Sequence, residues 1–203
     1  MRCLHALFAL LVALVAMGLA PEPDPIPRRW QLDFTPGPLR VITVDVDGVG
    51  PRQYYYFTYK VVNGSGQDQL FAPAVELATS HSLAERSGRN VPAQVTKQIL
   101  DMLENPFLLD QISIVGPLLQ GDANAKEGLA VWPVPTERSG ELTVYFAGLS
   151  GETRPIEVKD PKSGEISRVL LRKTLVMRYD MPGEIIEQGS KPFPMAEKRW
   201  ILR

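Results

Sequence analysis

The sequence predicts a mainly β protein: an antiparallel β-sandwich with one inserted α-helix at about residues 92–104. Apolar and polar residues alternate with a period of two along most of the chain after residue 30, which is the pattern of half-buried strands. The 18 prolines and 16 glycines divide these runs into short segments. A parallel α/β sheet would need a helix between most strands, and only one segment has helical spacing. We therefore expect a single domain over residues 30–203.

The alternation also orders the strands. Trp30, Leu32 and Phe34 alternate with polar residues, a turn is predicted at Pro36-Gly37-Pro38, and the next strand covers residues 39–47. The clearest strand covers residues 53–62, where aromatic and β-branched side chains suit a pleated surface. Further strands are predicted at residues 70–79, 111–115, 128–134, 141–147, 154–158 and 168–179 and at the C-terminus.

The single helix is predicted from a change of period. Val95, Ile99, Met102 and Leu103 recur at intervals of three and four. Asn90 is a candidate N-cap, Pro92 suits the first turn, and Pro106 ends the helix at or before Asn105.

The strand at 168–179 carries a basic stripe. Its apolar face is interrupted by Lys173, so a bulge or a strand end is predicted there. The opposite face carries Arg168, Arg172 and Arg178, which are candidate binding residues for an anionic surface, together with Lys198 to Arg203 at the C-terminus. The simpler interpretation is a solvated sheet face and a terminal strand packed by Trp200 and Ile201, and we favour it because the net charge is only −1.

The first twenty residues have the layout of a secretory signal peptide. Arg2 precedes an apolar run from Leu4 to Ala20, and small residues come just before a Pro-rich stretch. We expect a signal peptide at residues 1–20 and a linker at 21–29, with the mature protein in the periplasm, the cell envelope or outside the cell. An uncleaved membrane anchor is the alternative, because Pro21 follows the expected cleavage site directly.

Composition excludes several chemistries. The only cysteine, Cys3, lies in the predicted signal peptide, so the mature chain has no thiol for a disulfide, a metal or catalysis. The same cleavage removes His5 and leaves His81, which excludes a site of several histidines within one chain. We expect no cofactor, and the near-neutral charge gives no reason to expect nucleic acid.

Two segments resemble secreted immunoglobulin-like domains of bacteria. In the first, Tyr56 to Asp68, a strand ends in an Asn-Gly turn, and the next strand carries Pro73 and alternating apolar residues. The second, residues 128–133 and 144–153, is similar to a later hairpin of such domains. The whole chain also resembles an uncharacterised family of exported proteins of planctomycete-type bacteria. The resemblance implies an immunoglobulin-like β-sandwich with the helix as an insertion, and it implies no activity.

Short motifs give little support for catalysis or metal binding. Ser80-His81-Ser82 is the only Ser/His cluster, and Ser150 lies among glycines that do not fit the nucleophile elbow. Asp45 and Asp47, and the loop from Gly121 to Glu127, offer oxygen ligands for Ca²⁺ but lack the EF-hand pattern. We assign no catalytic residue and no metal ligand.

Tyr54 and Tyr56 share the strand face opposite the expected core. Exposed aromatic rings at such positions can stack on sugars or anchor a protein partner. The alternative, which we favour, is that the helix or the linker covers this face.

These observations favour an exported, non-enzymatic β-sandwich protein that acts by binding, or as a structural or accessory module of the cell envelope. We expect a protein or an envelope component as its partner. Two alternatives stay open. One is an enzyme that uses carboxylates or bound Ca²⁺ on carbohydrate or peptide, and the other is an accessory subunit tethered by an uncleaved signal.

Overall fold

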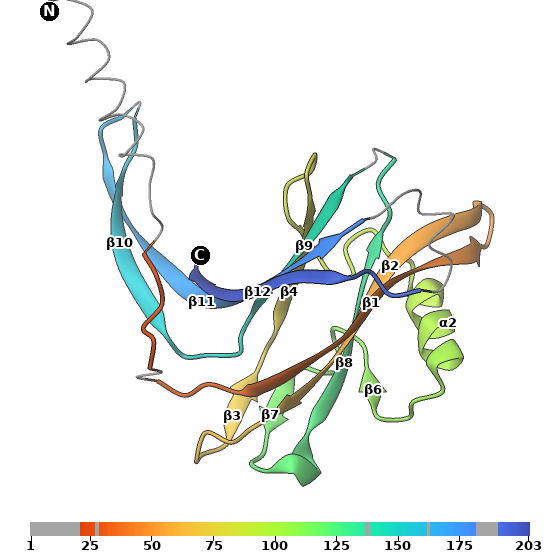
Figure 1. Ribbon diagram of the computed structural model, residues 1–203, viewed down its shortest axis with the longest axis horizontal. Coiled ribbons are helices and arrows are strands. Elements are labelled where there is room, and N and C mark those ends of the chain that lie inside the picture. Colours follow the sequence, from red (N-terminus) through yellow and green to blue (C-terminus); the bar gives the residue numbers. More distant parts are fainter. Residues whose placement is uncertain (1–20, 27–28, 137–138, 162, 182–190) are drawn as a thin grey trace, which may run out of the picture.

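The structure is a computed structural model that describes residues 21–26, 29–136, 139–161, 163–181 and 191–203 (Figure 1). The predicted signal peptide, residues 1–20, lies outside the described residues. The strands are β1 (Asp33–Val46), β2 (Gly50–Val62), β3 (Gln69–Phe71), β4 (Ala74–Thr79), β5 (Glu85–Arg86), β6 (Leu108–Leu109), β7 (Gly116–Leu118), β8 (Lys126–Pro133), β9 (Glu141–Ala147), β10 (Thr153–Lys159), β11 (Ile166–Asp180) and β12 (Met195–Leu202). The helices are α2 (Ala93–Leu103) and a short 3₁₀ helix, η1 (Asp122–Asn124).

Most strands belong to two sheets. The first sheet has the order β1-β2-β8-β6, with antiparallel pairing except between the short β6 and β8. The second sheet has the order β10-β11-β9-β4-β5, and β12 also pairs with β11. A small ribbon of β3 and β7 lies beside them. The prediction of a mainly β fold with antiparallel sheets is confirmed.

The main core lies between the two sheets. Tyr55, Phe57 and Tyr59 of β2 point toward Val144 and Phe146 of β9, and all five side chains are buried. The rings of Tyr59 and Phe146 meet edge-to-face with centroids 4.7 Å apart, a favoured geometry for aromatic pairs. Burial of alternate residues from each sheet is what a sandwich requires.

Helix α2 covers the other face of the first sheet. Its buried residues, Val95 and Ile99, pack in one cluster with Val44, Tyr54 and Tyr56. The alternate residues of β2 are therefore buried on this side too. This explains why the strand has aromatic side chains on both faces.

Several local predictions were wrong at proline and glycine. The expected turn at Pro36-Gly37-Pro38 is a bulge within β1, which pairs with β2 on both sides of it. The expected strand at 70–79 is two strands, β3 and β4, divided near Pro73.

The segment around the helix also differed from expectation. Residues 111–115 form turns rather than a strand, and Asp110 accepts hydrogen bonds from the backbone of Ile112 and Ser113. The helix itself is confirmed, but its N-cap is Pro92. Asn90 instead adopts a left-handed conformation and donates to Glu85.

Candidate functional site

A two-stranded hairpin extends from the body of the second sheet. We call residues 153–172, which comprise β10, its turn and the first half of β11, the arm. Figure 1 shows it curving away from the rest of the molecule. Residues 174–180 of β11 pair with β9 and residues 173–179 with β12, whereas residues 166–172 pair with β10. One strand therefore belongs to both the body and the arm.

Apolar side chains on the arm are exposed. The exposed fractions are 42% for Val158, 64% for Ile166, 40% for Val169 and 53% for Leu170. The cross-strand partners place Val169 beside Ile156 on one face and Leu170 beside Pro155 on the other. Both faces of the arm therefore expose apolar side chains, and exposed apolar surface is a feature of interaction sites.

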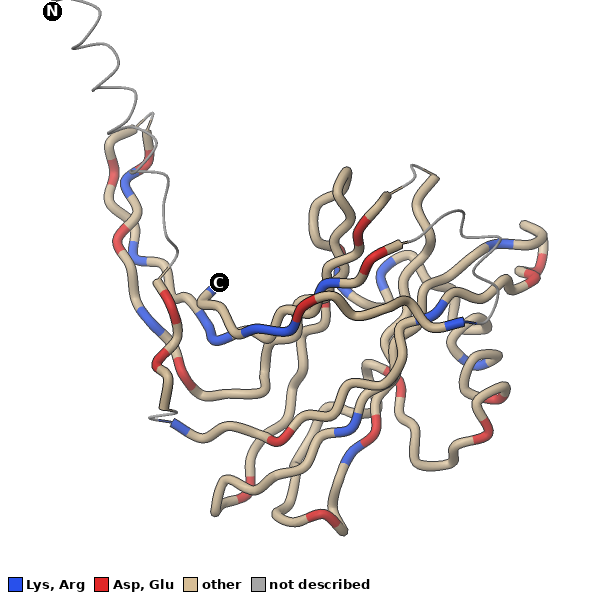
Figure 2. Tube along the Cα trace, in the orientation of Figure 1, with Lys and Arg blue, Asp and Glu red and all other residues tan. Residues whose placement is uncertain are grey.

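Charged side chains interleave with these apolar residues. Arg168 lies opposite Glu157 across the two strands, and both Arg168 and Arg172 are exposed. Figure 2 shows that positive and negative residues alternate along the arm. Arg178, the third arginine of the predicted stripe, lies on the body instead, 3.5 Å from Glu141 and 3.8 Å from Glu197. The structure thus groups Arg168 and Arg172 on the arm and leaves Arg178 in an ion-pair network.

A buried ion pair joins the arm to the body. The ammonium of Lys173 lies 2.9 Å from a carboxylate oxygen of Glu152, and both side chains are at least nine-tenths buried. The backbone amide of Asp24 donates to the other oxygen of Glu152 at 3.0 Å. The ring of Trp200 covers Lys173 at 5.3 Å. Lys173 interrupts the apolar pattern because it is a partner for this carboxylate.

The irregularity predicted at Lys173 does not lie in β11 but opposite it, in the segment that joins β9 to β10. β11 is unbroken, with Arg172 opposite Thr153 and Thr174 opposite Ala147. Residues 148–152 therefore lie opposite a single residue. Gly148, at φ +95°, begins this detour, and an added Cβ would lie 2.9 Å from the Ala72 carbonyl oxygen.

The environment of Glu152 stabilises its charged form. Burial alone would raise the pKa of this carboxyl, but the Asp24 amide, the hydrogen bond and charge of Lys173, and the charge of Arg154 outweigh it. The pKa of Glu152 is therefore lower than its ordinary value. Arg154 reaches back to Asp24 at 3.9 Å, so the N-terminal segment is fastened at the base of the arm.

The tyrosines proposed as a binding surface are not exposed. Tyr54 and Tyr56 are 5% and 4% exposed beneath α2, as in the alternative interpretation. The Ser150 hydroxyl donates to the Trp30 carbonyl and the Ser80 hydroxyl lies 2.9 Å from that of Ser139, while His81 is exposed on its loop. Ser80 and Ser150 therefore have structural roles, because their hydroxyls are engaged in hydrogen bonds within the fold.

The C-terminal basic residues are held against the second sheet. Arg203 pairs with Glu76 and lies over the ring of Tyr145 at 4.2 Å. Arg199 is 3.0 Å from Glu197. Across the part of the chain that the structure describes, no group of three or more His, Cys, Asp or Glu side chains is placed to hold a metal ion.

A pocket of about 360 Å³ lies where α2 stops covering the first sheet. Its lining includes Arg40, Thr58, Lys60, Asn105 and Glu127. Sequence reasoning missed it, because these residues come from three strands and a loop far apart in the chain. The Pro-Gly-Pro stretch, which forms the bulge at its edge, was the one local signal.

No helix among the described residues is long and apolar enough to cross a membrane. Comparisons of the chain with protein-family models, with curated proteins and with solved structures found no match.

Proposed function

We propose that this protein is an exported, non-enzymatic binding module that engages a protein partner of the cell envelope through the arm. The observation that carries the proposal is the arm itself, a projecting hairpin with four apolar side chains that are 40–64% exposed. A signal peptide at residues 1–20 and an immunoglobulin-like arrangement of the sandwich belong to the same proposal. They rest on the N-terminal apolar run and on the sequence resemblance.

The binding mode we propose is the addition of an extended strand to β11. Arg172 exchanges two backbone hydrogen bonds with Arg203, at 2.7 and 3.1 Å, just after the end of β12. Beyond this pair, residues 166–171 have no strand on that edge within the described parts of the chain. This stretch contains no proline and no bulge, two devices that commonly protect an exposed edge, and Arg168 is its one charged residue. A partner strand would continue the line of β12.

The charges suggest the chemistry of the partner strand. Arg168 and Arg172 lie on one face of β11, and Leu170 lies between them on that face. An extended segment with acidic residues around an apolar centre complements this pattern. Main-chain hydrogen bonds would supply affinity and the alternating side chains would supply specificity.

Site-specific photo-crosslinking in the native envelope tests the proposal. A photoreactive residue at Val169 is compared with one at Val49, an exposed valine in the β1–β2 turn that is 56% exposed. We expect one protein to crosslink at Val169 and not at Val49. Identical crosslinked species at both positions, or none at Val169, would overturn the proposal.

A matched pair of variants separates specific recognition by the arm from non-specific hydrophobic binding. Leu170→Lys and Ile112→Lys each place a charge at an apolar residue that is more than half exposed. We expect the crosslink to be lost in the first variant and kept in the second. The reversal Arg168→Glu tests the predicted acidic partner, and unchanged crosslinking would refute that part of the proposal.

A further inference from the structure

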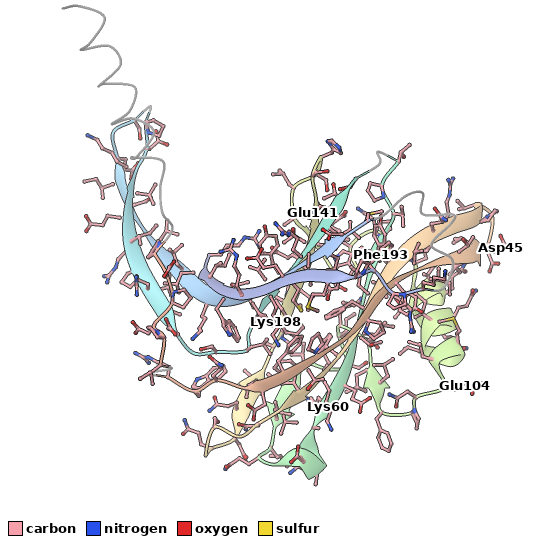
Figure 3. All side chains as sticks on the ribbon, in the orientation of Figure 1. Asp45, Lys60, Glu104, Glu141, Phe193 and Lys198 are labelled. Atoms are coloured by element: carbon pink, nitrogen blue, oxygen red, sulfur yellow. The ribbon has the colours of Figure 1, made fainter. Side chains whose placement is uncertain are left out.

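The pocket at the end of α2 exists for identifiable reasons. α2 ends at Leu103, where Glu104 adopts a left-handed conformation, and the chain then leads to β6 at the edge of the first sheet. The bulge in β1 forms one wall. At Gly37 an added Cβ would lie 2.2 Å from the hydroxyl oxygen of Thr58, so only glycine fits there. Figure 3 labels Lys60 on β2 and Glu104 after the helix, which bracket this region.

The pocket holds positive charge that the protein does not neutralise. Arg40 is half-buried, and its Nε is buried without a hydrogen-bond partner in the described structure. Among the described residues, no carboxylate lies within ion-pair distance of Arg40 or Lys60, although Glu127 is the cross-strand neighbour of Lys60. Buried polar groups are nearly always paired, so this guanidinium N–H is available to donate to an acceptor that a ligand brings.

The charge balance selects a ligand with one negative charge. Arg40 and Lys60 contribute two positive charges and Glu127 one negative charge, which leaves a local charge of +1. A guanidinium binds a carboxylate with favourable planar geometry. A phosphate dianion would exceed this charge and would face Glu127.

The remaining polar groups suit hydroxyls. Asn105 donates to one oxygen of Glu127 at 2.6 Å, which orients the carboxylate. Glu127 can accept hydrogen bonds from ligand hydroxyls, and the hydroxyls of Thr35 and Thr58, which also line the pocket, can donate or accept. The volume lies at the small end of ligand pockets, which are about 300–1,000 Å³.

We propose that this pocket binds a small monocarboxylate that carries hydroxyl groups, the chemistry of a sugar acid, with Arg40 and Lys60 on the carboxylate and Glu127 on a hydroxyl. The site lies on the first sheet and uses no residue of the arm. If glucuronate does not bind this pocket, the proposed protein interface on the arm is unaffected. If no protein binds the arm, the proposed ligand site in the pocket is likewise unaffected.

Titration of the full chain with D-glucuronate, followed by amide ¹H–¹⁵N spectra at pH 7, tests the proposal. We expect saturable shifts of the amide signals of residues 37, 39, 40, 105, 107 and 108. We also expect binding about tenfold weaker for neutral D-glucose, the loss expected for one charge-assisted contact. Equal binding of the two sugars, no shift with glucuronate, or tighter binding of inorganic phosphate would overturn it.

Variants of the pocket provide the control for folding. Arg40→Gln is expected to weaken glucuronate binding about tenfold, and Arg40→Lys to restore part of it because the charge returns. Arg52→Gln removes an exposed arginine of β2 that does not line the pocket, and this variant is expected to bind glucuronate as the original chain does. Thermal unfolding of each variant identifies any that fail to fold. Undiminished binding by a folded Arg40→Gln would refute the assignment.

Discussion

Replacing Lys173 with methionine tests the account of the arm junction. Methionine keeps the length and packing of the side chain but leaves the Glu152 carboxylate buried without its ammonium partner at 2.9 Å. Removing one partner of a buried ion pair costs about 3–5 kcal/mol. The amide of Asp24 and the charge of Arg154 still stabilise this carboxylate, so we expect a loss at the lower end, about 3 kcal/mol. That is a large part of the usual stability of a domain, about 5–15 kcal/mol.

A double variant measures the coupling between Lys173 and Glu152 directly. Glu152→Gln leaves Lys173 charged and buried, and we expect a similar loss of about 3 kcal/mol. In Lys173→Met combined with Glu152→Gln neither charge remains, so we expect a loss of only about 1 kcal/mol. The coupling between the two sites is then about 5 kcal/mol, which urea unfolding of the full chain at pH 7 can resolve. Additive losses, or single variants as stable as the original chain, would refute the reasoning.

Three further predictions concern acid stability and packing. The lowered pKa of Glu152 stabilises the fold above the ordinary value of 4.5 and loses that contribution as pH falls through the lowered value, so urea unfolding at a series of pH values should show a steeper acid decline than in the uncharged double variant. Ile99→Ala should cost about 2–5 kcal/mol by thermal unfolding, while Met102→Ala, at a residue 47% exposed, should cost about 0.5 kcal/mol or less. Gly128→Ala should cost about 1–3 kcal/mol, because the new Cβ would lie 2.2 Å from a buried tyrosine ring, whereas Gly140→Ala meets nothing within 4 Å; equal losses would contradict the packing argument.

The fold class was predictable because periodicity reports burial directly. The strand at 53–62 and the helix at 92–104 had long patterns, and the structure places elements within a few residues of both. Predictions failed where a tertiary contact decided the local structure. The stretch Pro36-Gly37-Pro38 has the composition of a turn, yet pairing with β2 on both sides keeps it within one strand.

The candidate sites were harder to predict, since they depend on what lies over each strand face. The sequence showed that Tyr54 and Tyr56 share a face, but the position of α2 decides that they are buried. The sequence also placed Arg168, Arg172 and Arg178 on one face of a single predicted strand. It did not show that β12 covers only part of that strand, which separates Arg178 from the other two.

The unbroken course of β11 has a mechanical consequence. Its fifteen residues run from the turn of the arm to the centre of the second sheet, with β9 and β12 bonded along the inner half. Interstrand hydrogen bonds lie perpendicular to the strands. Tension applied along the arm by a bound molecule would therefore load the bonds of that inner half together, in shear, rather than opening them one after another. Because β11 continues without a break into the second sheet, a pull on the end of the arm would be transmitted to the core and to the Lys173–Glu152 ion pair.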